Sequence, residues 1–149
     1  MFLRKRTTPT GGVSYSLLRS VRIGKYSRHE VIACLGPFST VAEALAAEII
    51  DGEHEIITLG LWENRPRSRE LREIKDGFAR RAQRIRRLIL ALHLTGGKGS
   101  DVKPYLQPRR DLHDASRRKV GLAAYRVTPR MEKYTDEWLD QLPERTTDP

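Results

Sequence analysis

The longest periodic segment of the chain, from about Pro66 to Leu94, constrains the fold more than any other feature. Its apolar residues recur at steps of three and four, as on one face of an α-helix. At about 1.5 Å per residue, such a helix would be roughly 40 Å long, far longer than a small sheet requires. We therefore predict one long amphipathic basic helix over residues 63–95. Its apolar stripe comprises Leu71, Ile74, Phe78, Ala82, Ile85, Leu88, Ile89 and Leu92.

Residues 11–62 predict a small β-hairpin followed by a helix. Apolar and polar residues alternate from Val13 to Ile23, which indicates a half-buried strand with Ser14, Ser16, Ser20 and Arg22 on its polar face. Gly24-Lys25 fits a two-residue turn, and the apolar run from Val31 to Leu35 predicts the returning strand. The hairpin alone would be marginally stable, so we expect the following helix to cover its apolar face.

Thr40 and Glu43 form a capping box at the start of that helix. We expect Gly52 to end the helix, and residues 55–59 to be able to add a third strand.

The two ends of the chain give weaker patterns. Residues 1–10 predict a basic flexible arm, and residues 96–149 predict a loop-rich segment with a C-terminal helix and a frayed tail. The last helix should begin at Thr128-Pro129 and pack through Met131, Tyr134, Trp138 and Leu142. Together these segments predict an α+β fold: a small antiparallel hairpin sheet packed by one helix, a long basic helix and a C-terminal helix.

Composition narrows the class of protein. Cys34 is the one cysteine of the chain, so no internal disulfide can form; we interpret it as a small apolar strand residue rather than a nucleophile. No apolar run is long enough for a membrane span, and the basic N-terminus lacks the apolar core of a secretory signal. We therefore expect a cytoplasmic protein without membrane contact.

The net charge of +9 is unevenly distributed. Residues 1–30 carry seven lysines and arginines against one acid, residues 31–60 carry none against five, and residues 61–90 carry ten against four. Two basic zones thus flank an acidic zone, which favours a charged face over diffuse solubilising charge.

The long helix carries a run of arginines that contains no acid. Like charges at helical spacing repel, so a neutralising partner is expected. Nucleic-acid phosphate would be one such partner, and the acidic segment with Glu43, Glu48, Asp51, Glu53 and Glu55 would be the other. The arginines are Arg80, Arg81, Arg84, Arg86 and Arg87.

The hairpin carries Arg19, Arg22, Lys25 and Arg28 around its turn. Two-stranded ribbons enter the major groove of DNA, where their side chains reach base edges. Ordinary surface charge on a hairpin is the alternative interpretation.

The segment from Gly11 to Ile50 resembles the N-terminal sheet-and-helix modules of tyrosine-family integrases and of some insertion-sequence transposases. The matching positions are Tyr15, Arg19, Gly24, Lys25, Arg28, Leu35-Gly36, Thr40, Glu43 and Ala44. The resemblance implies DNA binding, with Arg19, Arg22, Lys25 and Arg28 facing the groove, and an origin in a mobile element. It does not imply catalysis, because the catalytic domains of both families do not fit in the residues after 55.

Signals for catalysis are few. Asp101, Asp111, His113 and Asp114 could hold a divalent metal for a nuclease, but turn and capping roles fit their loop-like setting better. The GGKGS segment at 96–100 lacks the spacing of a phosphate-binding loop. His29, His54 and His93 are interpreted as structural or exposed, and Trp62 and Trp138 as packing residues. We therefore expect no metal and no cofactor.

The function predicted from the sequence is non-enzymatic binding of nucleic acid, DNA rather than RNA. The alternative is assembly with a protein partner or with a second copy. The stripe that would serve that alternative is Leu71, Ile74, Phe78, Ile85, Leu88, Ile89 and Leu92.

Overall fold

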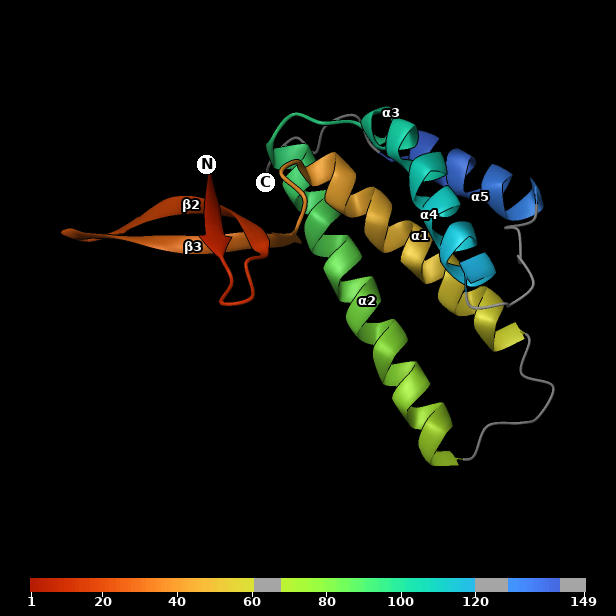
Figure 1. Ribbon diagram of the computed structural model, residues 1–149. Helices are drawn as coiled ribbons and strands as arrows, with labels where there is room; N and C mark the ends of the chain where they lie inside the picture. The colour runs from red at the N-terminus through yellow and green to blue at the C-terminus, as the bar shows by residue number, and fades with distance from the viewer. Residues whose placement is uncertain (61–67, 120–128, 143–149) are drawn as a thin grey trace.

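The computed structural model describes residues 1–60, 68–119 and 129–142. A three-stranded antiparallel sheet is followed by helices, which confirms the α+β class. The sheet lies to one side of the helical body (Figure 1). The strands are β1 (Phe2–Thr7), β2 (Val13–Ile23) and β3 (Tyr26–Gly36), and the helices are α1 (Val41–Gly60), α2 (Ser68–Leu94), α3 (Gly99–Val102), the 3-10 turn η1 (Lys103–Tyr105), α4 (Leu106–Lys119) and α5 (Pro129–Asp140).

The N-terminal residues are not a flexible arm. Phe2–Thr7 form β1, which pairs with β2 in antiparallel register from Phe2 opposite Leu18 to Thr7 opposite Val13. The prediction failed because Arg4, Lys5 and Arg6 dominate this segment, and only Phe2 and Leu3 are apolar. The sheet consequently has the order β1-β2-β3, with β2 in the centre.

The predicted hairpin of β2 and β3 is present. Gly24 has a φ of 60°, a left-handed conformation that suits a two-residue turn between Ile23 and Tyr26. Two register irregularities, near Tyr15 and near Leu17, interrupt the pairing of β2 with β3. Cross-strand partners share a face of the sheet, so the register assigns every strand side chain to one of two faces.

The inner face of the sheet carries Leu17 and Ala33, which are cross-strand partners and belong to the hydrophobic core. The outer face is the opposite one, where Leu18 is buried between its partners Phe2 and Val31. The described helices therefore cover the sheet on its inner face only.

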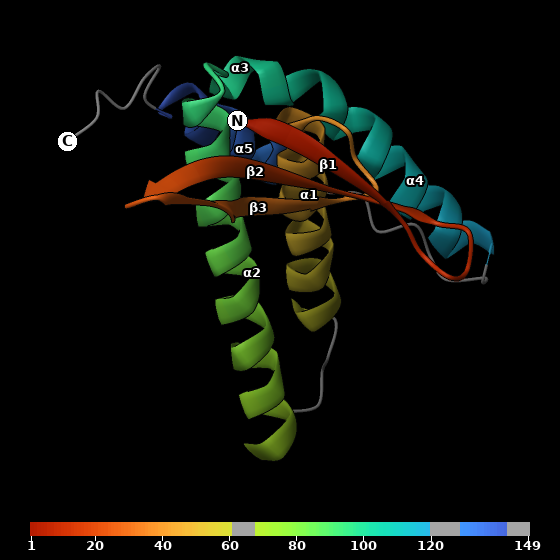
Figure 2. The same cartoon turned by 90° about the vertical axis from the view of Figure 1, so that its left-hand side faces the viewer.

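Helix α1 occupies the centre of the helical body. In Figure 2, α2 lies on one side of α1 and α4 on the other, with the sheet in front. Thr40 caps α1, since its Oγ1 accepts a hydrogen bond from the Glu43 backbone N–H at 3.3 Å. The fully buried side chains include Leu45 and Ile50 of α1, Val102 of α3 and Leu139 of α5.

Helix α1 continues past Gly52 to Gly60, so the expected helix end at Gly52 and the third strand at 55–59 were wrong. Gly52 has a packing role instead. A Cβ at this position would lie 3.1 Å from Cδ of Arg81, so the missing side chain makes room for that arginine. The β-branched residues after Gly52 favour a strand locally, but the packing of α1 overrides this preference.

Residues 99–119 are largely helical rather than loop-rich. Pro108 does not prevent α4, because it lies in the first helical turn, where its missing N–H is tolerated. Helix α5 begins at Pro129 as expected, but Tyr134 is 72% exposed, and Thr135 and Leu139 are buried beside Trp138 and Leu142. Thr128, Trp62 and the predicted frayed tail at 143–149 lie outside the described residues.

The apolar stripe of α2 is largely used within the chain. Leu88 and Leu92 are 3% and 2% exposed, and Ile85 and Ile89 pack against the same core. Ile74 and Phe78 are only half-buried. The part of the stripe that remains available to another protein is therefore its N-terminal end.

Candidate functional site

The arginines of α2 fall into two groups. Arg81 donates a hydrogen bond to Glu48 at 2.6 Å and forms a bidentate pair with Glu55. Arg84 donates a hydrogen bond to Glu48 at 3.2 Å. Glu48 and Glu55 flank Gly52 on one face of α1, so the Arg81 side chain lies across the glycine between two carboxylates. The hydrogen bond with Glu55, opposed by burial, raises the pKa of Arg81, and the charges of Glu55 and Glu48 add to this effect.

Asp51 of α1 is paired with α4. Its carboxylate accepts two hydrogen bonds from Arg109, at 3.3 and 3.4 Å, and lies 2.7 Å from Nε2 of His113. The His113 ring stacks on His54, with ring centroids 4.0 Å apart. Burial raises the pKa of the Asp51 carboxyl, but the hydrogen bonds from His113 and Arg109 outweigh this effect, so the pKa is lowered.

Glu53 forms the most buried ion pair described. Arg110 donates to it through Nε at 3.1 Å and Nη2 at 2.9 Å, and both side chains are 7% exposed. The Thr135 hydroxyl of α5 donates a third hydrogen bond to the same carboxylate at 2.6 Å. Burial lowers the pKa of Arg110, but the hydrogen bonds and charge of Glu53 outweigh burial and raise it. This cluster therefore joins α1, α4 and α5.

Four of the five acids in the predicted acidic segment thus hold arginines of the chain itself. Arg81 and Arg84 were predicted to contact nucleic acid, but their cations are engaged by Glu48 and Glu55. The sequence left both partners open, because nothing local shows that α1 and α2 lie side by side. Within the described ranges, Arg80, Arg86 and Arg87 are exposed and form no ion pair.

The distal part of the β2–β3 hairpin has a different setting. We call residues 19–30 the projecting ribbon, because their turn is the part of the sheet farthest from the helices in Figure 1. Every residue of the projecting ribbon is exposed except Val21, which is half-buried. Neither face of the ribbon is covered by the described helices, so both are open to a partner.

The cations of the projecting ribbon are divided between its two faces. Arg28 is the partner of Val21 and lies on the inner face, whereas Arg22 is the partner of Ser27 and lies on the outer face. Lys25 lies at the turn. Arg19 is on the inner face, where its Nε lies 3.2 Å from Oε2 of Glu30. Glu30 is the one carboxylate of the ribbon. The four cations therefore do not share one face of the ribbon, since the strand period puts them on both sides. That they face a DNA groove stays a prediction.

The outer face holds cations that were assigned to the arm by sequence. Arg4 is the partner of Ser16, and Arg6 is the partner of Ser14, so both extend the outer face beyond the projecting ribbon. No apolar–polar alternation marks residues 2–7, in which two apolar residues precede three cations, so their place on the outer face follows from the observed register alone. Cys34 lies opposite Ser16 and is exposed, although its neighbours Ala33 and Leu35 are buried.

The candidate metal residues are not brought together. Asp101 accepts a hydrogen bond from the Lys98 backbone N–H at 2.8 Å and caps α3, and Asp111 accepts one from Gln107 at 2.9 Å. His113 contacts Asp51 instead. Among the described residues, no three His, Cys, Asp or Glu side chains are grouped so that they could hold a metal ion.

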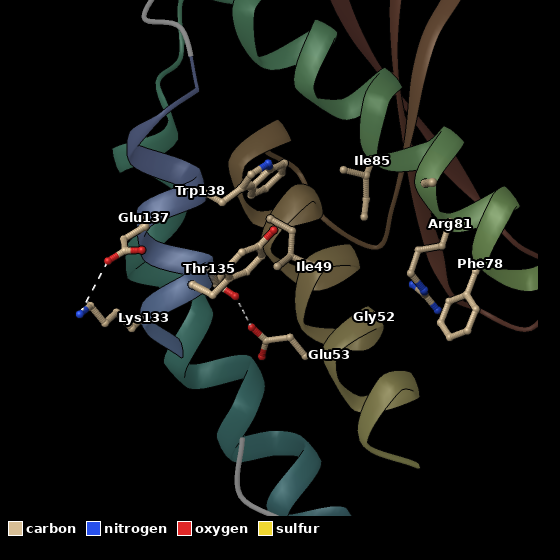
Figure 3. Close-up of a pocket in the computed structure, with 12 residues that line it drawn as sticks. Ile49, Gly52, Glu53, Phe78, Arg81, Ile85, Lys133, Thr135, Glu137 and Trp138 are labelled. Atoms are coloured by element: carbon tan, nitrogen blue, oxygen red, sulfur yellow. Dashed lines mark hydrogen bonds and ion pairs between the residues drawn. The ribbon is translucent and has the colours of Figure 1, made fainter. Parts of the chain in front are cut away.

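Residues of α1, α2 and α5 line a groove of about 800 Å³ (Figure 3). Phe78 and Ile85 of α2, Ile49 of α1 and Trp138 of α5 form its apolar walls. The charged groups of its lining already have partners within the chain, because Arg81 is paired with Glu48 and Glu53 with Arg110. On α5, Nζ of Lys133 lies 3.9 Å from Oε1 of Glu137, and both side chains are exposed.

Across residues 1–60, 68–119 and 129–142, we find no helix that is both long and apolar enough to span a membrane. Comparisons with protein-family models, with curated proteins and with solved structures give no match to this chain.

Proposed function

We propose that this chain is a non-enzymatic DNA-binding protein that inserts its projecting ribbon into the major groove. One observation carries the proposal: the ribbon is exposed on both faces and carries four cations, of which only Arg19 has an ion-pair partner among the described residues. A ribbon between two phosphate backbones needs cations on both faces, and Arg22 and Arg28 meet this requirement.

The dimensions of the ribbon suit duplex DNA. The major groove is about 12 Å wide and 8.5 Å deep, whereas the minor groove is about 6 Å wide. Two strands lie roughly 4.8 Å apart before side chains are added, and three residues advance about 10 Å. The tip of the ribbon would therefore reach the groove floor with Ser20 and His29 at the rim. The deep and narrow major groove of A-form RNA would not admit it.

Each cation has a distinct part in this arrangement. Arg22 and Arg28 contact phosphates on opposite sides of the groove, since they lie on opposite faces of the ribbon. Lys25 lies at the tip, and Arg4 and Arg6 extend the outer face toward the flanking backbone. The exposed arginines of α2 act only by long-range attraction, which salt screens within about 8 Å at physiological ionic strength.

Fluorescence anisotropy with a labelled duplex tests the proposal. The chain should bind duplex DNA in low salt, and replacing Arg22, Lys25 and Arg28 by Gln should weaken binding by roughly 100-fold, given about 0.9 kcal/mol for each contact. The matched control replaces Arg69, Arg72 and Lys75, three exposed cations at the end of α2 away from the sheet (Figure 2). Absence of binding in low salt, or equal loss in both variants, would refute the proposal.

Assembly through the stripe of α2 is the second candidate. The half-buried Phe78 at the groove beside α5 favours it, but Leu88 and Leu92 are already packed inside the chain. Size-exclusion chromatography with light scattering in high salt distinguishes the two. A stable oligomer that Phe78→Ser dissociates would support assembly, and a monomer would exclude it.

A further inference from the structure

The tip of the projecting ribbon carries two exposed apolar side chains. Tyr26 is 81% exposed and Ile23 is 53% exposed, and they are cross-strand partners on either side of the Gly24-Lys25 turn. Scattered exposed apolar residues are ordinary on a protein surface. This pair differs because its members are adjacent, terminate the ribbon and are surrounded by Arg22, Lys25 and Arg28.

Packing inside the chain does not account for the pair. Neither residue belongs to the hydrophobic core or contacts it among the described residues. The turn itself requires Gly24 for its positive φ, but it does not require apolar side chains at its flanks. Their exposure therefore suggests a contact with an external partner.

The floor of the DNA major groove presents an apolar group that such a pair could contact. Base edges in the major groove present hydrogen-bond donors and acceptors, and thymine adds its C5-methyl group, the apolar feature read there by apolar side chains. A tyrosine ring beside an isoleucine provides an apolar surface that matches a methyl group. Arg22, Lys25 and Arg28 supply the complementary charge for the phosphates on both sides.

We propose that Ile23 and Tyr26 are specificity-determining residues that contact thymine C5-methyl groups at the floor of the major groove. This inference rests on the proposed DNA-binding function. It gives the ribbon two separate tasks, because the cations contribute affinity for any sequence while the apolar tip discriminates between bases.

A pair of duplexes isolates the methyl group. One mixed-sequence duplex is made with thymine and the other with deoxyuridine in its place, so that charge and base-pair hydrogen bonds are identical. The full chain should prefer the thymine duplex by about fourfold for each methyl group contacted. Replacing cytosine by 5-methylcytosine in a G·C-rich duplex should strengthen binding in the same direction, because that methyl group occupies the equivalent position.

Variants assign the preference to the tip. Tyr26→Ser and Ile23→Ser should each reduce the preference, and the double variant should abolish it while still binding DNA in low salt. Tyr134→Ser is the matched control, since Tyr134 is 72% exposed on α5, and it should keep the full preference. Both tip residues are exposed, so the variants should fold like the wild type.

The outcomes separate the two proposals. Equal binding of the thymine and deoxyuridine duplexes by the wild type would overturn the methyl contact but leave the DNA-binding function in place. A preference that survives in the double tip variant would also overturn it. Absence of binding to every duplex would overturn the DNA-binding function and this inference with it.

Discussion

The helical body and the projecting ribbon are both rich in arginine, but they use it differently. In the helical body, Arg81, Arg84, Arg109 and Arg110 are held by carboxylates of α1. In the ribbon, Arg22, Lys25 and Arg28 form no ion pair within the described part of the chain. A count of basic residues cannot tell these regions apart.

The difference follows from what lies next to each cation. Burying an ion pair is costly unless its geometry and additional hydrogen bonds compensate, and the cluster of Glu53, Arg110 and Thr135 provides both. Among the described helices, no acidic one lies beside the ribbon, so Arg22, Lys25 and Arg28 stay hydrated and available. Arginine in the body therefore stabilises the fold, whereas Arg22 and Arg28 in the ribbon remain free for a ligand.

The largest expected effect is on the stability of the body. Arg110→Met leaves Glu53 buried without its cation, so it should lower the free energy of unfolding by about 3–5 kcal/mol. Arg28→Gln in the ribbon should change it by at most about 0.5 kcal/mol. Urea denaturation followed by circular dichroism measures both. Similar losses in the two variants would remove the distinction between body and ribbon.

A smaller effect concerns acid sensitivity. Because the pKa of Asp51 is lowered from its ordinary value of 3.8, its pairing with Arg109 and His113 stabilises the fold above that value. The stabilisation is lost as the pH falls through the lowered pKa. Asp51→Asn should therefore cost about 1 kcal/mol at neutral pH and progressively less in acid. Unfolding free energies measured across this pH range check the trend.

Arg28→Gln is the control for that titration, since Arg28 is exposed on the ribbon and forms no ion pair in the described part of the chain. A cost of Asp51→Asn that stays constant from neutral pH into acid would show that the ion pair is not the origin of the stabilisation.

The smallest effect tests how the ribbon is used. Cys34 is the single cysteine and lies exposed on the outer face, eight residues from Tyr26 at the tip. Insertion of the tip leaves Cys34 outside the groove, so saturating DNA should change its alkylation rate by less than about twofold, with no contact formed there. Mass spectrometry measures the rate. Strong protection would mean that DNA lies flat on the outer face instead.

The sequence predicted the elements whose signals are local. Alternation from Val13 to Ile23 and the glycine at position 24 specified the hairpin, and the period of three and four specified α2. Strand β1 was missed because residues 2–7 show no apolar–polar alternation, and the pairing with β2 that forms the strand is a tertiary contact. The extension of α1 beyond Gly52 was missed because Gly52 serves a contact with Arg81, which is 29 residues away in the sequence.

The residues of the candidate site likewise fall into those that local sequence predicts and those that depend on long-range packing. The cations of the hairpin could be named from sequence, since they follow directly from the strand and turn residues. Their separation onto two faces required the observed register. The pairing of Arg81 with Glu48 and Glu55 depends on the long-range packing of α1 and α2, so sequence left it as one of two open alternatives.

The salt dependence of DNA binding tests the central claim most directly. Replacing Arg22, Lys25 and Arg28 by Gln should reduce the slope of the logarithm of affinity against the logarithm of salt by about 2.7, which is about 0.9 for each phosphate that the variant no longer neutralises. Replacing Arg80, Arg86 and Arg87, three exposed arginines of α2, removes the same charge and should change the slope by less than about 1. An equal or larger change for the α2 variant would contradict the claim that the ribbon, rather than the basic helix, contacts DNA.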